Sequence, residues 1–322
     1  SSTGLGHLYR LFALVEMYKE DYEYIFITRE DSVLEVIPSE YPVKIIPNTI
    51  KISNEPKWLA DHFYPELYVV ITDGYQFTSA YQKDIKNLGY FLMFIDDMTT
   101  EYMFADIVVN HSPQVKKTNF KSESYTSFAL NLKYAILRPQ FLKTAIRTPN
   151  VLKKKSFFIN FGGVDKLNLS LKFLKILLDL NEINSINVLL GAAASNKEIE
   201  MLANKHPKII NLHRNLQESE LIYLLQSCTH AIVPSSTILF ELFCFNINLY
   251  SGYFVDNQKE AFLDFKNKEF VKGLGNFTKF NPEEFKLDLD KFINSKNSIS
   301  LKKQLIDGKQ KQRFLKLLKN KL

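Results

Sequence analysis

Short apolar runs alternate with helix-length amphipathic stretches along most of this sequence. They form two series, at residues 24–28, 67–72, 90–95 and 107–110, and then at residues 156–161, 187–190, 209–212, 230–233 and 248–252. Apolar runs of this length between helical segments are typical of buried parallel strands. The pattern therefore predicts an α/β fold with two doubly wound parallel sheets.

A polar segment separates the two series. It contains Pro149 and the three lysines at 153–155, and it suits an interdomain linker. We therefore expect a first domain over residues 1–150 and a second over residues 151–322. Residues 301–322 form a basic amphipathic helix interrupted by a glycine, which either lies in solvent or crosses back to the first domain.

Composition narrows the function classes. The 322 residues, 46% of them hydrophobic, are enough for two cores. The formal charge of +6 is mild and its lysines are not interleaved with aromatic residues, so we expect no nucleic-acid partner. No apolar run approaches the roughly 18 residues of a membrane span. The sequence does not indicate an oligomeric state.

The cysteines and histidines bear on compartment and metal use. Cys228 and Cys244 lie in apolar surroundings without C-x-x-C spacing, which favours buried thiols in a reducing, cytoplasmic compartment. The six histidines show no metal-ligand spacing. We therefore expect neither a metal nor another cofactor.

The loop Gly4-Leu5-Gly6-His7 precedes an apolar helix. Glycines allow close approach of the backbone to a ligand, and a helix start offers unpaired N–H groups. Loops of this kind normally follow a strand, and nothing before Gly4 supplies one, so we expect the first strand of this domain to be missing from the chain.

Polar clusters also follow strands in the second half. The turn Gly162-Gly163, with Asp165 and Asn168 after it, either lies against a phosphate or is a tight turn capped by Asp165. In the same way, Ser236 and Thr237 either bind a diphosphate, with Glu241 accepting from ribose hydroxyls, or form a capping box with Glu241. Amide groups of Asn257 and Gln258 follow the next strand, and in open α/β sheets this edge is where ligands bind.

Two acidic clusters end strands of the first half. They are Asp73-Gly74-Tyr75 and Ile95-Asp96-Asp97. Acidic residues in this position more often cap and close turns than catalyse, so both roles remain open.

Nine motifs occur in a fixed order over residues 1–313. They are Gly4-x-Gly6-His7-x-x-Arg10, Asp73-x-Tyr75, Ile95-Asp96-Asp97, Asp106 with Asn110, Tyr134-Ala135-Ile136-Leu137-Arg138, Gly162-Gly163-x-Asp165 with Asn168, Ser236-Thr237 with Glu241, Asp256-Asn257-Gln258, and Ile306-Asp307-Gly308. In this order they resemble the UDP-2,4-diacetamido-2,4,6-trideoxy-β-L-altropyranose hydrolases of pseudaminic acid biosynthesis.

The resemblance implies a GT-B architecture, with two Rossmann-like domains facing a cleft, related to the glycosyltransferase that adds N-acetylglucosamine to lipid-linked muramyl-pentapeptide. It implies metal-independent hydrolysis of the sugar–UDP bond with inversion at the anomeric carbon. His7 takes the position of the family's catalytic histidine, and Tyr75 and Asn257 match polar residues of its active site. Glu241 matches its ribose-binding acid. The residues expected to bind UDP or sugar are Gly4, Gly6, Arg10, Gly162, Gly163, Asp165, Asn168, Ser236, Thr237, Glu241 and Gln258.

The hypothesis that follows is a UDP-sugar hydrolase in which a neutral His7 deprotonates the attacking water. Two alternatives are a glycosyltransferase on the same fold and a non-catalytic nucleotide-sugar-binding fragment. A flavodoxin-like regulatory protein that uses Asp96 and Asp97 would leave the Gly162-Gly163 turn and Glu241 without roles.

Overall fold

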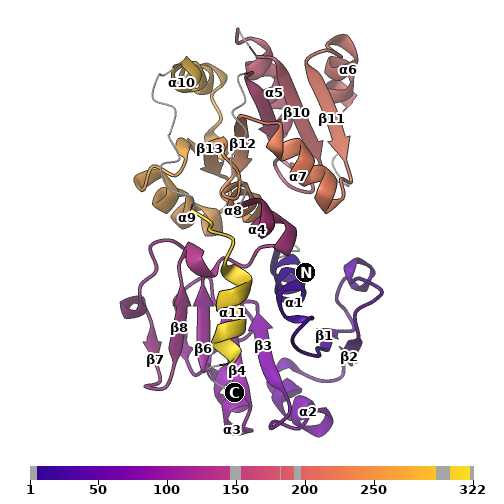
Figure 1. Ribbon diagram of the computed structural model, residues 1–322, viewed down its shortest axis with the longest axis vertical. Helices are drawn as coiled ribbons and strands as arrows, with labels where there is room; N and C mark the ends of the chain where they lie inside the picture. The colour runs from indigo at the N-terminus through magenta and orange to yellow at the C-terminus, as the bar shows by residue number, and fades with distance from the viewer. Residues whose placement is uncertain (1–5, 146–153, 182, 192–196, 295–304, 320–322) are drawn as a thin grey trace. The chain divides into compact units, whose positions relative to one another are not determined.

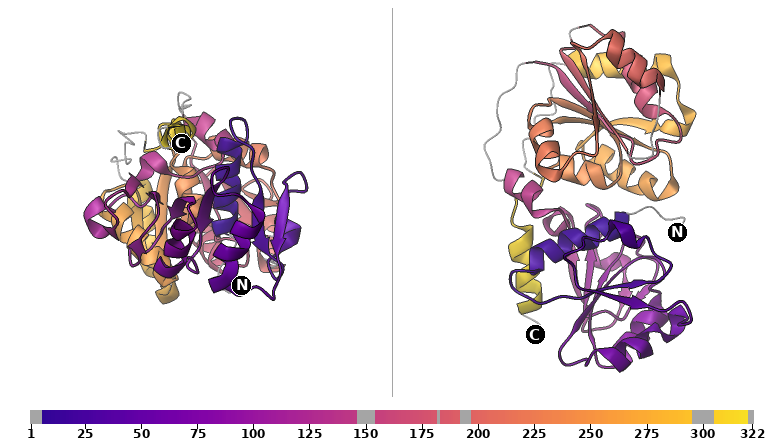
Figure 2. Two further views of the ribbon diagram at one scale, coloured as in Figure 1. Left: turned by 90° about the horizontal axis from the view of Figure 1, so that it is seen from below. Right: turned by 90° about the vertical axis from the view of Figure 1, so that its right-hand side faces the viewer.

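The chain folds into two compact units, described by a computed structural model that covers residues 6–145, 154–181, 183–191, 197–294 and 305–319 (Figures 1 and 2). The first unit consists of residues 1–139 and 309–322, and the second of residues 140–308. The boundary expected near residue 150 lies outside the described residues. The described residues 309–319 pack on the first unit, whereas the expected second domain of 151–322 included them.

The first unit is built around parallel strands. Its main elements are α1 (Gly6–Tyr18), β1 (Phe26–Arg29), β2 (Val43–Ile46), α2 (Glu55–His62), β3 (Val69–Asp73), α3 (Ser79–Asn87), β4 (Phe91–Ile95), β5 (Tyr102–Met103), β6 (Ile107–Asn110), β7 (Lys121–Ser122) and β8 (Ser127–Leu130). Short 3₁₀ turns cover Leu34–Val36, Ile52–Asn54, Lys117–Asn119 and Leu132–Tyr134. The strands pair in parallel as β3-β4-β6-β8, as β1-β2 and as β5-β7.

Two apolar clusters hold this unit together. One lies between the four-stranded sheet and α2 with α3, and it includes the fully buried Ile85, Tyr90 and Leu92. In the other, Phe12 of α1 packs on Phe26 of β1. Helix α1 also contacts β3, so its first turn is set against the carboxyl end of that strand.

The last helix, α11 (Gln310–Lys319), packs on the first unit although it follows the second in the sequence (Figure 1). Phe314 is fully buried, and its carbonyl accepts a 3.0 Å hydrogen bond from the Tyr18 hydroxyl of α1. The Gln310 amide donates to the Leu132 carbonyl at 3.2 Å. Of the two alternatives for this basic helix, the structure has the one that returns to the first domain.

The second unit contains a single six-stranded parallel sheet among its described residues. Its elements are α4 (Pro139–Ala145), which begins on the last residue of the first unit, β9 (Ser156–Ile159), α5 (Leu169–Leu178), β10 (Ser185–Leu190), α6 (Lys197–Lys205), β11 (Ile210–Arg214), α7 (Glu218–Gln226), β12 (His230–Pro234), α8 (Thr237–Leu242), β13 (Asn248–Tyr253), α9 (Asp256–Asn267), β14 (Lys272–Asn276), a 3₁₀ turn at Phe277–Lys279 and α10 (Pro282–Asn294). The strand order is β11-β10-β9-β12-β13-β14, in which the direction of winding reverses between β9 and β12. This is the Rossmann order.

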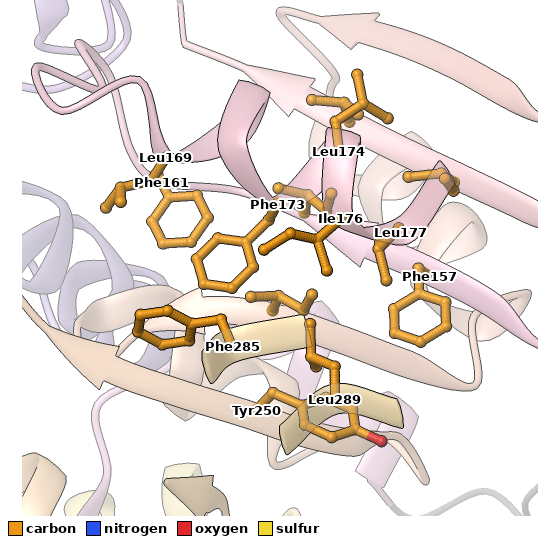
Figure 3. Packing of buried hydrophobic residues seen from close by; sticks show 14 of the residues in the cluster. Phe157, Phe161, Leu169, Phe173, Leu174, Ile176, Leu177, Tyr250, Phe285 and Leu289 are labelled. Atoms are coloured by element: carbon orange, nitrogen blue, oxygen red, sulfur yellow. The ribbon is translucent and has the colours of Figure 1, made fainter. Parts of the chain in front are cut away.

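Alternating apolar side chains of these strands face an aromatic cluster on one side of the sheet (Figure 3). The Phe173 ring of α5 stacks on Phe161 at 5.5 Å and meets the edges of Phe277 and Phe285. Helices α5, α6 and α10 cover this face, while α7, α8 and α9 lie on the opposite face (Figure 1). Each predicted strand of both series is present, shifted by at most a few residues.

Two further predictions concern thiols and membranes. Cys228 and Cys244 are buried free thiols, as expected. Burial raises the pKa of Cys228 to about 11, so it remains a thiol at neutral pH. Within the described ranges, each helix is too short or too polar to cross a bilayer.

Candidate active site

The amino end of α1 meets the carboxyl ends of β3 and β4. His7 and Arg10, three residues apart on α1, lie on the same helix face. Strands β3 and β4 pair in parallel with Asp73 opposite Ile95, so Asp73 and Asp97 project from the same sheet edge. The sequence thus brings two basic and two acidic side chains together from three elements.

Arg10 binds both carboxylates at once. Its Nε and Nη2 donate to the two oxygens of Asp73 at 2.6 and 2.5 Å, and Nη1 and Nη2 donate to those of Asp97 at 2.7 and 2.8 Å. The Asp73 side chain is completely buried and that of Arg10 is 10% exposed. Burial alone would lower the pKa of Arg10, but the charges and hydrogen bonds of Asp73 and Asp97 raise it above its usual value. Two bidentate interactions of this kind fix the orientation of the guanidinium plane.

His7 is held by the same carboxylate. Its Nδ1 lies 2.7 Å from Oδ1 of Asp73. Two lone pairs would repel each other at this distance, so Nδ1 must carry the proton, and the neutral ring then has its lone pair on Nε2. The 3.1 Å approach of Nη2 of Arg10 to Nδ1 is therefore a contact between two donors that share one acceptor. The arrangement leaves Nε2 as the basic atom.

Tyr75 packs on the histidine. Its ring meets His7 edge to face, with centroids 4.9 Å apart and planes at 88°. The turn that places it contains Gly74, whose φ of 149° is one that other residues rarely adopt. Tyr75 is 46% exposed, so a ligand beside His7 can contact its side chain.

The acidic pair after β4 divides into two roles. Asp96 accepts from the Thr99 N–H at 3.0 Å and from the Asn110 amide at 2.9 Å, which closes the turn and ties β4 to β6. Burial raises the pKa of Asp96. Burial would also raise the pKa of Asp97, but the charge and hydrogen bonds of Arg10 outweigh it and lower that pKa. Asp97 therefore stays ionised in the cluster.

His111 follows β6 at the same edge. Burial, reinforced by the positive charge of Arg10, lowers its pKa to about 4. At neutral pH this imidazole is uncharged, and it adds no positive charge to the cluster. The single guanidinium of Arg10 therefore faces two carboxylates, those of Asp73 and Asp97.

The ligand atoms of His7, Asp73 and Asp97 lie within 4.8 Å of one another, a spacing that suits a divalent cation. The guanidinium of Arg10 lies among them and already donates to both carboxylates. A metal ion would have to displace this guanidinium, so in this arrangement Arg10 holds the positions that a metal would need.

In the second unit, the two glycine- and hydroxyl-bearing loops flank the point at which the winding reverses. The Gly162-Gly163 turn follows β9 and the Ser236-Thr237 segment follows β12, which are neighbours in the sheet. Gly162 has a φ of 82°, a conformation that favours glycine. A Cβ on Gly191, after β10, would overlap the backbone of Gly163, so the loop after β10 packs tightly against the Gly162-Gly163 turn. Ligands of open α/β sheets bind at this switch point.

Asp165 and Asn168 form a helix start. The Asp165 carboxylate accepts from the N–H groups of Leu169 and Ser170, both at 2.8 Å. Asn168 takes a left-handed conformation and donates its N–H to the Asp165 carbonyl at 2.9 Å. The capping alternative is therefore the one observed at Asp165, whose carboxylate accepts hydrogen bonds from the first N–H groups of α5.

At the other loop, the structure does not show the capping role that the alternative gave to Ser236. Ser236 precedes α8, yet its side chain makes no capping hydrogen bond. Thr237 is exposed, and Glu241 is 8% exposed on the same short helix. These residues stay candidates for a nucleotide.

The remaining predicted residues divide into placed and unplaced ones. Gly6 begins α1, whereas Gly4 lies outside the described residues, as does the side chain of Asn257 on α9. Gln258 accepts the Phe254 N–H at 3.2 Å through its side-chain oxygen, which closes the loop before α9. The structure thus joins His7, Arg10 and Tyr75 in one unit and the Gly162 and Ser236 loops in the other.

Three side chains of the cluster were not among the predicted site residues. They are Asp73, Asp97 and His111. Asp73 ends β3, Asp97 is the second residue after β4 and His111 directly follows β6, all at the same sheet edge, which is the signal that would have identified them.

The fold is that of the GT-B sugar-nucleotide enzymes. The crystal structure of Acinetobacter baumannii MurG superimposes with a TM-score of 0.67 at 11% identity, covering 98% of this chain and 96% of that one. A UDP-glucosyltransferase from Polygonum tinctorium superimposes with a TM-score of 0.63 at 11% identity, covering 99% and 96%. At these identities the likeness concerns the fold alone.

Among curated proteins, the chain is similar to the UDP-2,4-diacetamido-2,4,6-trideoxy-β-L-altropyranose hydrolase of Campylobacter jejuni. They are 26% identical over 274 residues, which is 81% of this chain and 91% of the relative. An uncharacterized protein of Methanocaldococcus jannaschii is 28% identical over 277 residues, 82% of this chain, and the match spans only 56% of that longer protein. No family model matches the sequence. The similarity supports an enzyme that acts on UDP-sugars.

Proposed function

We propose that this chain hydrolyses a UDP-linked 2,4-diacetamido-2,4,6-trideoxy sugar to UDP and the free sugar, a step of pseudaminic acid biosynthesis in the cytoplasm. The observation that carries the proposal is the His7 imidazole, held through Nδ1 by a buried carboxylate with Nε2 left as a base. The similarity to the Campylobacter hydrolase supports the substrate class.

In the proposed reaction, Nε2 of His7 takes a proton from water, and the water oxygen attacks the anomeric carbon. The bond from that carbon to the UDP oxygen breaks, and UDP leaves with the electron pair. A single displacement inverts the configuration at the anomeric carbon. General-base catalysis of this kind contributes roughly 10²- to 10⁴-fold to the rate.

The surroundings of His7 suit this transition state. Positive charge develops on the sugar ring as the glycosidic bond breaks. The two carboxylates of the Arg10 cluster outnumber its guanidinium and favour that charge. Tyr75, beside the imidazole, and Asn257 would orient the sugar and the water.

The second unit would hold the nucleotide. Backbone amides of the Gly162-Gly163 turn and the start of α8 at Ser236-Thr237 would meet the diphosphate, and Glu241 would accept from the ribose hydroxyls. Amide dipoles can then offset the charge on UDP, so the proposed reaction is metal-independent.

Product analysis in H₂¹⁸O tests the proposal. The protein alone with UDP-2,4-diacetamido-2,4,6-trideoxy-altropyranose should release free sugar that carries one heavy oxygen, together with unlabelled UDP. Label in UDP would mean attack at phosphorus and would refute the proposal. Turnover only after addition of an acceptor alcohol would favour the glycosyltransferase alternative. UDP affinity without turnover would favour a non-catalytic nucleotide-sugar-binding fragment.

A further inference from the structure

Arg10 is the link between three elements of the first unit. It extends from α1 and forms four hydrogen bonds with carboxylates at the ends of β3 and β4. A guanidinium has five N–H donors, so only one is left outside these bonds. The motif predicts Arg10 as a ligand of substrate or UDP, but its donors are directed into the protein.

Arg10 also fixes the acceptor of His7. Of the two oxygens of Asp73, Oδ2 receives Nε of Arg10, and Oδ1 receives both Nη2 of Arg10 and Nδ1 of His7. Asp73 is completely buried, and a buried carboxylate needs charged or hydrogen-bonding partners. Rotation of this carboxylate would break two bonds to Arg10, so the guanidinium determines where the His7 ring finds its acceptor.

Asp97 completes the arrangement from the other side. It binds the Nη1 and Nη2 edge of the guanidinium, while Asp73 binds the Nε and Nη2 edge. With both edges held, the plane of Arg10 is fixed relative to both strands. Lysine has one ammonium group and cannot form a bidentate pair of hydrogen bonds to each of two carboxylates.

We propose that Arg10 is a positioning residue that, braced by Asp97, holds Asp73 as the acceptor of His7 Nδ1 and so keeps the basic Nε2 directed at the substrate. The inference rests on the proposed function for its kinetic effect, but the geometry of the network can be tested without substrate.

The kinetic test compares the Arg10→Met and Arg10→Lys variants with the wild type in UDP release from the same UDP-sugar. Both variants should lose at least tenfold in kcat, with KM changed less than about threefold, since about 1.4 kcal/mol of transition-state stabilisation corresponds to tenfold. Lysine retains the charge, so wild-type kcat in Arg10→Lys would overturn a role that depends on the planar guanidinium and its bidentate hydrogen bonds. A loss confined to KM or to UDP affinity would mean that Arg10 binds substrate.

A spectroscopic test reads the imidazole directly. In protein labelled with ¹⁵N-histidine, wild-type His7 should show a protonated Nδ1 and an unprotonated Nε2 above pH 7.5, assigned by the loss of its signals in His7→Asn. Arg10→Met should shift both signals toward a mixture of tautomers. Unchanged signals in Arg10→Met would overturn the proposal even if activity falls.

Matched variants separate positioning from folding. Arg29 pairs with the buried Glu55 in the same unit but outside the cluster, so Arg29→Met should lower stability without changing the His7 signals or kcat per folded molecule. If Arg10→Met does not fold, Asp97→Asn serves instead, because it leaves the Arg10–Asp73 pair and should change the His7 signals partly. Wild-type His7 signals in Asp97→Asn would then overturn the bracing role. Absence of turnover in the wild type would refute the proposed function alone, since the spectra still test the network.

Discussion

Replacement of His7 by asparagine should abolish catalysis while preserving the hydrogen bond to Asp73. The side-chain amide of asparagine lies about where Nδ1 of histidine lies, so it can donate to Oδ1 of Asp73 as the imidazole does at 2.7 Å. It has no atom in the place of Nε2. The variant therefore removes the base and leaves its support.

The size of the effect follows from the role of Nε2. A general base contributes roughly 10²- to 10⁴-fold, or about 3 to 5 kcal/mol of the barrier at about 1.4 kcal/mol per decade. His7→Ala loses the base and also the hydrogen bond to a charged acceptor, which contributes about 1.5 to 3 kcal/mol to stability. The two variants should thus have equally low kcat, and the alanine variant should be the less stable in urea.

The assay is UDP release under saturating UDP-sugar, with UDP affinity measured by calorimetry. UDP affinity should stay within about twofold of wild type in both variants, because we place the nucleotide on the second unit. Wild-type kcat in His7→Asn would remove Nε2 from the chemistry and refute the mechanism. A large loss of UDP affinity would instead place His7 at the nucleotide.

Three further predictions concern the nucleotide site and stability. Glu241→Gln should weaken UDP binding about tenfold and abolish any preference for UDP over 2′-deoxy-UDP. An unchanged preference would argue against a contact between Glu241 and the ribose. Burial lowers the pKa of His230 to about 4, so the folded state resists its protonation: stability is full above about pH 6.5 and falls by roughly 3 kcal/mol toward pH 4. In His230→Phe this pH dependence of urea unfolding should be reduced, and an undiminished slope would assign it to other groups. Phe173→Ala should destabilise the second unit by about 3 to 5 kcal/mol, because its ring is fully buried against aromatic neighbours, while the exposed Leu287→Ala serves as control; equal unfolding midpoints would refute this.

The strands that the sequence predicts are those with continuous apolar runs. Strands β9 and β12 are buried at each residue, and their runs are visible in the sequence. Strand β14 was missed, because Lys272–Asn276 contains two glycines and a single large apolar residue. Strand β2 was missed because Val43–Ile46 is a run of only four residues, interrupted by Lys44 and flanked by Pro42 and Pro47. Edge strands do not need apolar residues on both faces, so periodicity does not reveal them.

The candidate site was predicted in part for a similar reason. His7 stood out because it follows a loop with two glycines and precedes an apolar helix. Asp73 and Asp97 were seen as strand ends, but an acidic residue there has a common structural role, which Asp96 in fact fulfils. Only the pairing of β3 with β4 and the position of α1 decide which carboxylate meets Arg10. These are long-range contacts that local spacing does not encode.

The path of the chain through its two units has a consequence for biosynthesis. Residues 140–308 are contiguous, so the second unit can complete its fold as soon as they leave the ribosome. The first unit is complete only when α11 covers it, where Phe314 packs against Tyr18 and Leu318 is buried. Until α11 has been synthesised, the apolar surface that it covers, which includes Tyr18, is exposed to solvent and to chaperones. The first unit, most of which is synthesised first, therefore completes its fold after the second unit.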